Sequence, residues 1–188
     1  MTPFIQTQRL TLRPPVAADA EAIAHHLNDF AVSGNLAQVP YPYRLEDARA
    51  WLRTRRHDLP VERVNFAIVL DGAYIGQVGF HPGPRGPVVG YWLGQPYWNR
   101  GIMSEAVRAS LDWYFSATGA PFINSGVFYF NAASLAIQRK LGFVEIGRST
   151  LLCLARGAEV EHIDTQLTRE RFRRFSAAPA RQQQSSNR

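Results

Sequence analysis

Cysteine and long apolar runs are nearly absent from this sequence, and each absence narrows the kind of protein it can encode. A single cysteine, Cys153, stands among 188 residues. It excludes an internal disulfide and any zinc site built on several thiolates. No stretch approaches the roughly 18–20 consecutive apolar residues of a membrane span. The first residues also lack the apolar run of a signal peptide. We therefore expect a cytoplasmic protein with no membrane partner and no bound metal.

Acidic residues are scarce only near the C-terminus. The net charge of +6 and the isoelectric point of about 10.0 would suggest a nucleic-acid partner. However, residues 169–188 hold six arginines and one glutamate, which leaves 15 basic and 14 acidic residues in the first 168. Because the body is nearly neutral, we expect no nucleic-acid partner. Ribosome or nucleic-acid binding through the arginine-rich tail stays open as an alternative.

The length and composition predict a single domain followed by a short tail. Hydrophobic residues make up 46% of the chain, which is enough to bury a sizeable core. Residues 1–175 contain no linker-like stretch, so we assign them to one domain. Residues 176–188 are rich in Ala, Gln and Ser without an apolar period, and we expect them to be disordered.

The apolar periodicity predicts an α/β (α+β) fold in which a mixed sheet carries helices on both faces. The predicted order is β-αα-βββ-α-β-α-ββ. The expected strands are 9–13, 64–70, 73–80, 88–93, 122–130, 143–147 and 159–167, and the expected helices are 17–29, 45–57, 101–117 and 132–140. Residues 33–43 should form an irregular loop, and Gly142 should end the last helix. We expect His25 and His26, both on the first helix, to be exposed.

One segment has the features of an anion-binding site. Residues 90–106 read as a buried strand, a tight loop and the start of a helix. The first turn of a helix has unpaired N–H groups and the positive end of the helix dipole, so it can hold a pyrophosphate. Gly101 lets the backbone approach a ligand closely, and Arg100 adds a cation. The spacing matches neither a P-loop nor a Rossmann glycine motif.

Three motifs in this chain resemble those of the GNAT acetyltransferases. Residues 90–93 (Gly-Tyr-Trp-Leu) and 97–106 (Tyr-Trp-Asn-Arg-Gly-Ile-Met-Ser-Glu-Ala) resemble the acetyl-CoA loop of the branch that includes the RimJ/RimL ribosomal-protein N-terminal acetyltransferases. Residues 131–143 resemble the Asn-x-x-Ser…Lys-Leu-Gly-Phe element of the family, and residues 7–14 resemble its opening strand. The resemblance covers about residues 7–168 and implies a mostly antiparallel GNAT-like central sheet.

This resemblance implies an N-acetyltransferase that moves acetyl from acetyl-CoA to a primary amine by direct attack in a ternary complex. A protein N-terminal α-amine is one candidate acceptor, and a monomer and a homodimer both stay open. The resemblance places the pantetheine arm on the Leu93 backbone and the pyrophosphate on the N–H groups of 100–104. The implied cofactor-binding residues are Trp92, Leu93, Trp98, Asn99, Arg100, Gly101, Ile102, Met103, Ser104, Asn131 and Ser134. Tyr41, Tyr43 and His81 are expected in the acceptor groove.

Some positions depart from the family pattern. Trp98 and Met103 replace the Gln/Arg and Gly/Ala of the general loop motif. Gln138 stands where many members have a tyrosine that acts as general acid, and the branch suggests Ser134 as the proton donor instead. The missing tyrosine keeps a catalytically silent acyl-CoA-binding module as an alternative.

Several residues keep more than one interpretation. The general base stays open among His81, His162 and Glu161. Asn131 suits a helix N-cap as well as a cofactor contact. Glu105 is explained by the helix dipole alone, so we interpret it as structural.

Overall fold

The computed structural model describes residues 3–55 and 60–177. Eight strands in this part of the chain form one sheet, ordered β1-β2-β3-β4-β5-β6-β8-β7. Every neighbouring pair is antiparallel except β5–β6, which is parallel. The strands are β1 (Ile5–Gln6), β2 (Leu10–Arg13), β3 (Asn65–Leu70), β4 (Ala73–Gly83), β5 (Gly86–Leu93), β6 (Phe122–Phe128), β7 (Val144–Cys153) and β8 (Ala158–Thr168). The predicted mixed, mostly antiparallel sheet is confirmed.

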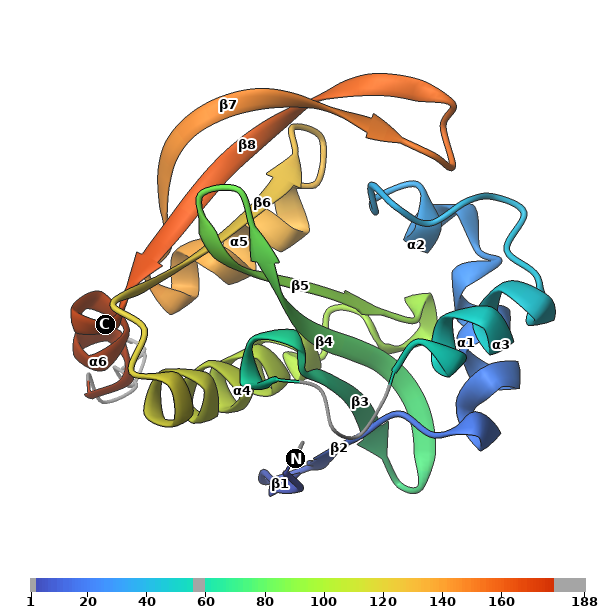
Figure 1. Ribbon diagram of the computed structural model, residues 1–188, viewed down its shortest axis with the longest axis horizontal. Helices are drawn as coiled ribbons and strands as arrows, with labels where there is room; N and C mark the ends of the chain where they lie inside the picture. Colours follow the sequence, from blue (N-terminus) through green and yellow to red (C-terminus); the bar gives the residue numbers. More distant parts are fainter. Residues whose placement is uncertain (1–2, 56–59, 178–188) are drawn as a thin grey trace, which may run out of the picture.

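Helices cover both faces of this sheet (Figure 1). They are α1 (Ala20–Leu27), α2 (Phe30–Ser33), α3 (Leu45–Arg53), α4 (Ile102–Thr118), α5 (Ala132–Leu141) and α6 (Arg169–Ala177), with 3-10 turns at Ala17–Asp19, Val61–Arg63 and Gln95–Tyr97. One buried cluster joins the sheet to α4 and α5, and a second joins its other face to α1 and α3. Because apolar residues alternate along β3 and β4, each face of these strands serves one cluster.

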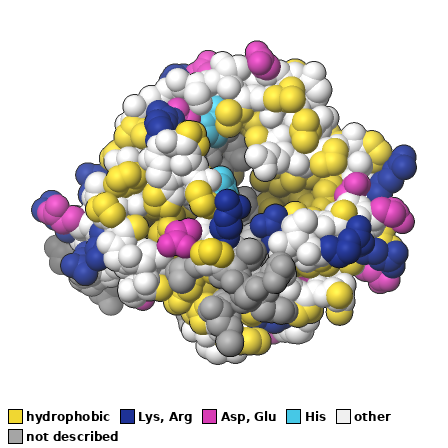
Figure 2. All heavy atoms as spheres, in the orientation of Figure 1, with side chains coloured by type: hydrophobic (Ala, Val, Ile, Leu, Met, Phe, Trp, Pro, Cys, Tyr) yellow, Lys and Arg dark blue, Asp and Glu magenta, His cyan; other side chains and the backbone are white. Residues whose placement is uncertain are grey.

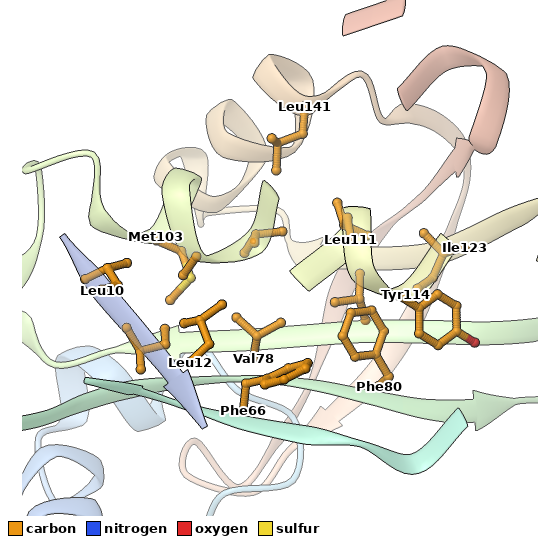
Figure 3. Close-up of a cluster of buried hydrophobic side chains, with 14 of the residues drawn as sticks. Leu10, Leu12, Phe66, Val78, Phe80, Met103, Leu111, Tyr114, Ile123 and Leu141 are labelled. Carbon is orange, nitrogen blue, oxygen red and sulfur yellow. The ribbon is translucent and has the colours of Figure 1, made fainter. Parts of the chain in front are cut away.

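The larger core lies between the sheet and α4. Figure 3 shows side chains of β2, β3 and β4 meeting those of α4, with Leu141 of α5 beside them. Tyr114 of α4 stacks on Phe80 of β4 with ring centroids 4.4 Å apart. Buried aromatic pairs of this kind stabilise a fold beyond the area that they bury. The core therefore holds α4, and with it the loop that precedes α4, rigidly against the sheet.

One predicted helix is shorter than expected, the strand expected over 143–147 extends as β7 to Cys153, and one helix was not expected. The helix expected over 17–29 breaks before α2, because the Asp29 carboxylate accepts a hydrogen bond from the Ala31 N–H at 2.8 Å and starts a new helix. The helix α6 was not expected, and its buried Phe172 lies 5.5 Å from the Phe115 ring. The helix α6 reaches Ala177, so it includes the first two residues of the predicted tail.

The end of α5 and the burial of His26 test two further local predictions. The left-handed conformation of Gly142 ends α5 as expected. The predicted end of the second helix near residue 57 lies outside the described residues, as does 178–188 of the predicted tail. His26 is buried, against expectation, because its ring packs 5.8 Å from the Tyr97 ring and directly against Gly94.

The sheet opens between β5 and β6. The two strands are paired only at Val88 and Asn124, and the Ser125 hydroxyl donates to the Val89 carbonyl at 2.9 Å just beyond that pair. Past this point the strands diverge (Figure 1). The N-terminal part of the sheet carries α4 and the C-terminal part carries α5, so a cleft forms where the two parts separate.

The hairpin of β7 and β8 arches back toward α2 (Figure 1). At its tip the Leu154 N–H donates to the Ala37 carbonyl at 3.0 Å, and Arg156 Nε donates to the Gly34 carbonyl at 2.8 Å. The Arg156 guanidinium also lies 5.0 Å from the centre of the Phe30 ring. Cys153 is fully buried beneath this contact.

Neither a bilayer-crossing helix nor a multidentate metal site is found in the described part of the chain. No helix there is both long and apolar enough to cross a membrane. No group of three or more His, Cys, Asp or Glu side chains in residues 3–55 and 60–177 is arranged to hold a metal ion.

Candidate active site

A cleft of about 1230 Å³ runs through the opening between β5 and β6. Figure 2 shows a hollow near the middle of one face, bordered by histidine, Lys/Arg and hydrophobic side chains. The volume exceeds the roughly 300–1,000 Å³ of a typical small-ligand pocket, so it can hold two substrates together. All the residues expected to bind the cofactor line it: Trp92, Leu93, Trp98, Asn99, Arg100, Gly101, Ile102, Met103, Ser104, Asn131 and Ser134.

The loop before α4 presents backbone N–H groups to the cleft. Asn99 and Gly101 have positive φ angles of 58° and 71°, which turn the chain sharply into the helix. The Glu105 N–H makes the first helical hydrogen bond, to the Gly101 carbonyl at 3.1 Å. The N–H groups of residues 102–104 therefore have no helical partner and are available to an anion. This geometry is suited to a pyrophosphate.

A brace from the N-terminal strand holds this loop. The Thr7 hydroxyl donates to Glu105 Oε1 at 2.6 Å, and Arg9 Nε donates to Glu105 Oε2 at 2.8 Å. Arg9 Nη1 also donates to the Arg100 carbonyl at 2.9 Å, so one guanidinium joins the helix to the loop. Burial alone would raise the pKa of Glu105, but the hydrogen bonds from Thr7 and Arg9 outweigh it and hold the pKa below its ordinary value. Glu105 is thus part of a network, which the helix dipole alone did not predict.

Trp98 closes the end of β5. Its indole N–H donates to the Leu93 carbonyl at 2.7 Å. The Leu93 carbonyl, expected to face the pantetheine arm, therefore already has one partner and keeps one lone pair for another donor. The Trp92 side chain points to the other face, where its ring lies 6.4 Å from His26 and 5.9 Å from Tyr74.

Ser134 has a partner that the sequence did not reveal. Its hydroxyl lies 2.9 Å from the Tyr91 hydroxyl, which reaches across from β5. Burial raises the pKa of Tyr91 to about 12, so this phenol stays protonated near neutral pH. Asn131 caps α5 by accepting the Ser134 N–H at 3.1 Å, which is the capping role that its position allowed. The paired hydroxyls offer a proton at the α5 side of the cleft.

Gln138, at the position of the family tyrosine, lies outside the cleft and is only 1% exposed. Its Nε2 donates to the Ser125 hydroxyl at 2.9 Å, and its Oε1 accepts from the Thr165 hydroxyl at 2.8 Å. Buried polar groups need such partners. Gln138 therefore joins α5 to β6 and β8.

Two of the three residues expected in the acceptor groove line the cleft. Tyr43 and His81 line the cleft. Tyr41 does not: it is 47% exposed and its ring packs edge-on against Phe30 at 5.3 Å. Of the three candidate bases, Glu161 also lies away from the lining, where it forms an ion pair with Arg148.

His162 lines the cleft within a small polar cluster. Its Nδ1 lies 2.8 Å from Asp164 Oδ1, Arg85 contacts Asp164 Oδ2 at 2.7 Å, and the Ser149 hydroxyl donates to Oδ1 at 2.8 Å. Burial alone would raise the pKa of Asp164, but the hydrogen bonds from Arg85, His162 and Ser149 hold it below its ordinary value. Sequence reasoning missed Asp164, because its partners come from the β4–β5 turn and from β7.

The charge along the cleft is mainly positive. Among its described lining residues, the acids comprise Asp164 alone, against the arginines Arg55, Arg85, Arg100 and Arg156. Asp164 is itself paired with Arg85. A nearby positive charge disfavours an ammonium and lowers its pKa. The cleft lining therefore disfavours a bound cation.

Known proteins share both the sequence pattern and this fold. The family model "Acetyltransferase (GNAT) domain" matches residues 9–144. A SPbeta prophage-derived uncharacterized N-acetyltransferase, YokL of Bacillus subtilis (strain 168), is 26% identical over 169 residues, or 88% of this chain and 93% of the relative.

Two solved structures have the same fold. RimJ of Mycobacterium smegmatis, in complex with CoA-disulfide, superposes with a TM-score of 0.74 at 24% identity and covers 86% of this chain and 82% of its own. The ribosomal-protein-S5-alanine acetyltransferase of Vibrio fischeri gives 0.74 at 22% identity, covering 90% and 98%. At these identities the two structures support the fold and leave the acceptor open.

Proposed function

The chain belongs to the GNAT acetyltransferase family, whose domain model spans residues 9–144, and from this premise we propose that it moves acetyl from acetyl-CoA to a primary amine by direct attack in a ternary complex. The observation that carries the proposal is the loop of residues 98–104, which opens the unpaired N–H groups of α4 onto the gap between β5 and β6. A pyrophosphate at that helix terminus would direct the pantetheine arm into the gap.

The chemistry needs no covalent enzyme intermediate. The neutral amine attacks the thioester carbonyl carbon, the C–N bond forms and the C–S bond breaks. The leaving thiolate takes a proton from the hydroxyl pair of Ser134 and Tyr91, which lies on the α5 side of the cleft. Cys153, fully buried and outside the lining, is poorly placed to carry an acyl group.

We favour a protein N-terminal α-amine as the acceptor, in keeping with the RimJ/RimL-like motifs of residues 97–106 and 131–143. An α-amino group has a pKa near 7.7–8.0 and a lysine near 10.4, so the α-amine loses its proton more cheaply. The arginines along the cleft reduce that cost further. They also disfavour polycationic acceptors such as polyamines and aminoglycosides.

The test is thiol release from acetyl-CoA by the purified protein across a panel of amines, with the product mass read for each. Peptides starting with Ser, Ala or Met should be acetylated at the α-amine, and matched peptides with a blocked N-terminus and an internal lysine should not. Release only with polyamines or aminoglycosides would overturn the α-amine assignment. Silence across the panel in a protein that acetyl-CoA still stabilises against heat would indicate an acyl-CoA-binding module without this activity. Silence without stabilisation would refute the proposal.

A further inference from the structure

We propose that the imidazole Nε2 of His162 is the general base that deprotonates the acceptor amine, with Asp164 as its positioning residue. This assignment rests on the acetyl transfer proposed above and deepens it. Four observations carry it: the face on which His162 lies, its level along the opening of the sheet, the tautomer that its partner imposes, and the weaker placement of the other candidates.

His162 lies on the face of the sheet opposite the hydroxyl pair. Neighbouring residues of a strand point to opposite faces. On β6, Ser125 points to α5, where it meets Gln138, so Gly126 points to the other face. The His162 ring lies directly over Gly126, since a Cβ built on Gly126 would be 2.0 Å from the His162 Cε1. A proton acceptor and a proton donor therefore flank the cleft from opposite sides, so one can take the proton of the amine while the other gives a proton to the thiolate.

His162 also lies at a position along β8 that faces the opening between β5 and β6. The parallel contact of β5 and β6 ends at Val88 and Asn124. Beyond it, His162 is paired across from Phe128 and Asp164 across from Gly126, in the part of β6 that has separated from β5. The His162 side chain is 16% exposed and lines the cleft. It thus borders the gap that the thioester would enter.

The partner of His162 determines which ring nitrogen can accept a proton. The ionised carboxylate of Asp164 can only accept hydrogen bonds. With Oδ1 at 2.8 Å, the His162 Nδ1 must carry the hydrogen, so the Nε2 of the neutral ring keeps its lone pair. Arg85 and Ser149 hold the carboxylate in place. No hydrogen bond to His162 Nε2 arises from the described residues, and this nitrogen can therefore face an acceptor amine.

The other candidates are less well placed. His81 Nδ1 donates to the carbonyl of the adjacent Pro82, at 3.0 Å, and the His81 side chain is exposed. It pairs with Val88, at the closed end of the gap. The charged groups around His162 are Asp164 on its own strand and Arg85 from the β4–β5 turn, whereas β6 and β7 contribute Phe128 and Ser149, which are uncharged.

The protons of the proposed acetyl transfer balance without a further reactant. The acceptor ammonium gives one proton to His162 Nε2 and becomes a neutral amine. That amine forms the C–N bond as the C–S bond breaks. Its nitrogen then loses a second proton to water, and the thiolate gains a proton from the hydroxyl pair, which water reprotonates. The imidazolium releases its proton to water, and the net products are the amide, the thiol and one proton.

The first experiment compares the pH profiles of wild type, His162→Gln, Asp164→Asn and a control, His25→Gln, which alters an exposed histidine of α1. We expect His162→Gln to lower kcat by about 10²–10⁴-fold at pH 7. The acid limb of kcat/KM should then follow only the ionisation of the acceptor amine, near 7.7–8.0. Asp164→Asn should lower kcat and change that limb, and the control should match wild type. The affinity for acetyl-CoA should stay within about twofold in all four proteins. An unchanged acid limb in His162→Gln, or the same change in His81→Gln instead, would overturn the proposal.

A second measurement needs no acceptor. Long-range ¹H–¹⁵N NMR, recorded with the His162 ring uncharged, should show the proton of this ring on Nδ1. The substitution Asp164→Asn should move that proton to Nε2. A proton on Nε2 in the wild type would overturn the proposal even if no acceptor is found. Failure of the acetyl-transfer proposal gives a different pattern: the wild type itself releases no thiol and gains no stability from acetyl-CoA.

Discussion

Glu105→Gln tests whether the N-terminal brace stabilises the protein beyond a helix-dipole effect. The substitution keeps the shape of the side chain but replaces one acceptor oxygen by an amide donor facing Arg9, which currently donates to Oε2 at 2.8 Å and forms an ion pair at 2.7 Å. Hydrogen bonds to charged groups contribute about 1.5–3 kcal/mol each. Arg9 is 41% exposed, so solvent screens part of this. We expect the free energy of unfolding to fall by about 1–2 kcal/mol at pH 7.

The pH dependence separates the brace from other causes. Because the folded pKa of Glu105 lies below that of the unfolded chain, near 4.3, its contribution is full above the unfolded value and is lost as the pH falls through the folded one. Glu105→Gln lacks this titration, so its difference from wild type should shrink on acidification. Urea unfolding at pH 7 and at several values below about pH 4.3, down to about pH 2, measures it.

The matched control is Glu21→Gln. Glu21 also lies in the first turn of a helix, α1, and is exposed, so its loss reports the dipole effect of about 0.3–1 kcal/mol. If Glu105→Gln costs no more than this control, or costs the same at every pH, the network reasoning is refuted. Since Arg9 also holds the Arg100 carbonyl, Glu105→Gln should weaken acetyl-CoA binding, whereas the control should not.

Four further substitutions have defined outcomes. Gln138→Leu leaves two buried hydroxyls short of a partner and should cost about 2–4 kcal/mol in urea unfolding; a loss under 0.5 kcal/mol would contradict the buried link. Trp98→Phe removes the indole hydrogen bond that closes β5 and should raise the acetyl-CoA Kd several-fold by calorimetry, with no change meaning that the cap is dispensable. Gly126→Ala should displace the His162 ring and lower kcat at constant acetyl-CoA affinity; equal kcat would show that the ring position is not required. Burial, followed by the neighbouring histidine charge, lowers the pKa of His26, so stability should fall as the pH drops below about 6.5, and His26→Gln should flatten that slope.

Sequence periodicity predicted most of the sheet because its signals are local. The Asp71–Gly72 turn, with φ angles of 50° and 82°, is the hairpin geometry that this dipeptide favours. By contrast, α6 alternates arginines with few apolar residues, and contacts with distant residues hold it, such as that of Phe172 with Phe115 and that of Arg171 with the Gly142 carbonyl. A helix that depends on such a contact leaves little local signal.

In the candidate site too, the sequence revealed what is local and missed what depends on distant residues. The loop of residues 97–106 was found because its motif is contiguous. Tyr91 and Asp164 were missed, since their roles depend on partners in other elements: Ser134 of α5 for the first, and Arg85 of the β4–β5 turn for the second. Tyr41 was misplaced because nearness in sequence to the acceptor loop does not determine which way a side chain points.

The tip of the β7–β8 arch is tied to the loop after α2 through Leu154 and Arg156. Ala37 and Arg156, on the two sides of this tie, line the same cleft as His162, so we expect the tie to narrow its entrance to an aperture. We expect such an aperture to select by shape before any chemistry occurs. A free chain end or a small amine can pass through it. A lysine on a convex folded surface cannot, because the protein surface around the lysine collides with the arch. The arch would then select acceptors by size, and the strength of the contacts at its tip would determine how large an acceptor can enter.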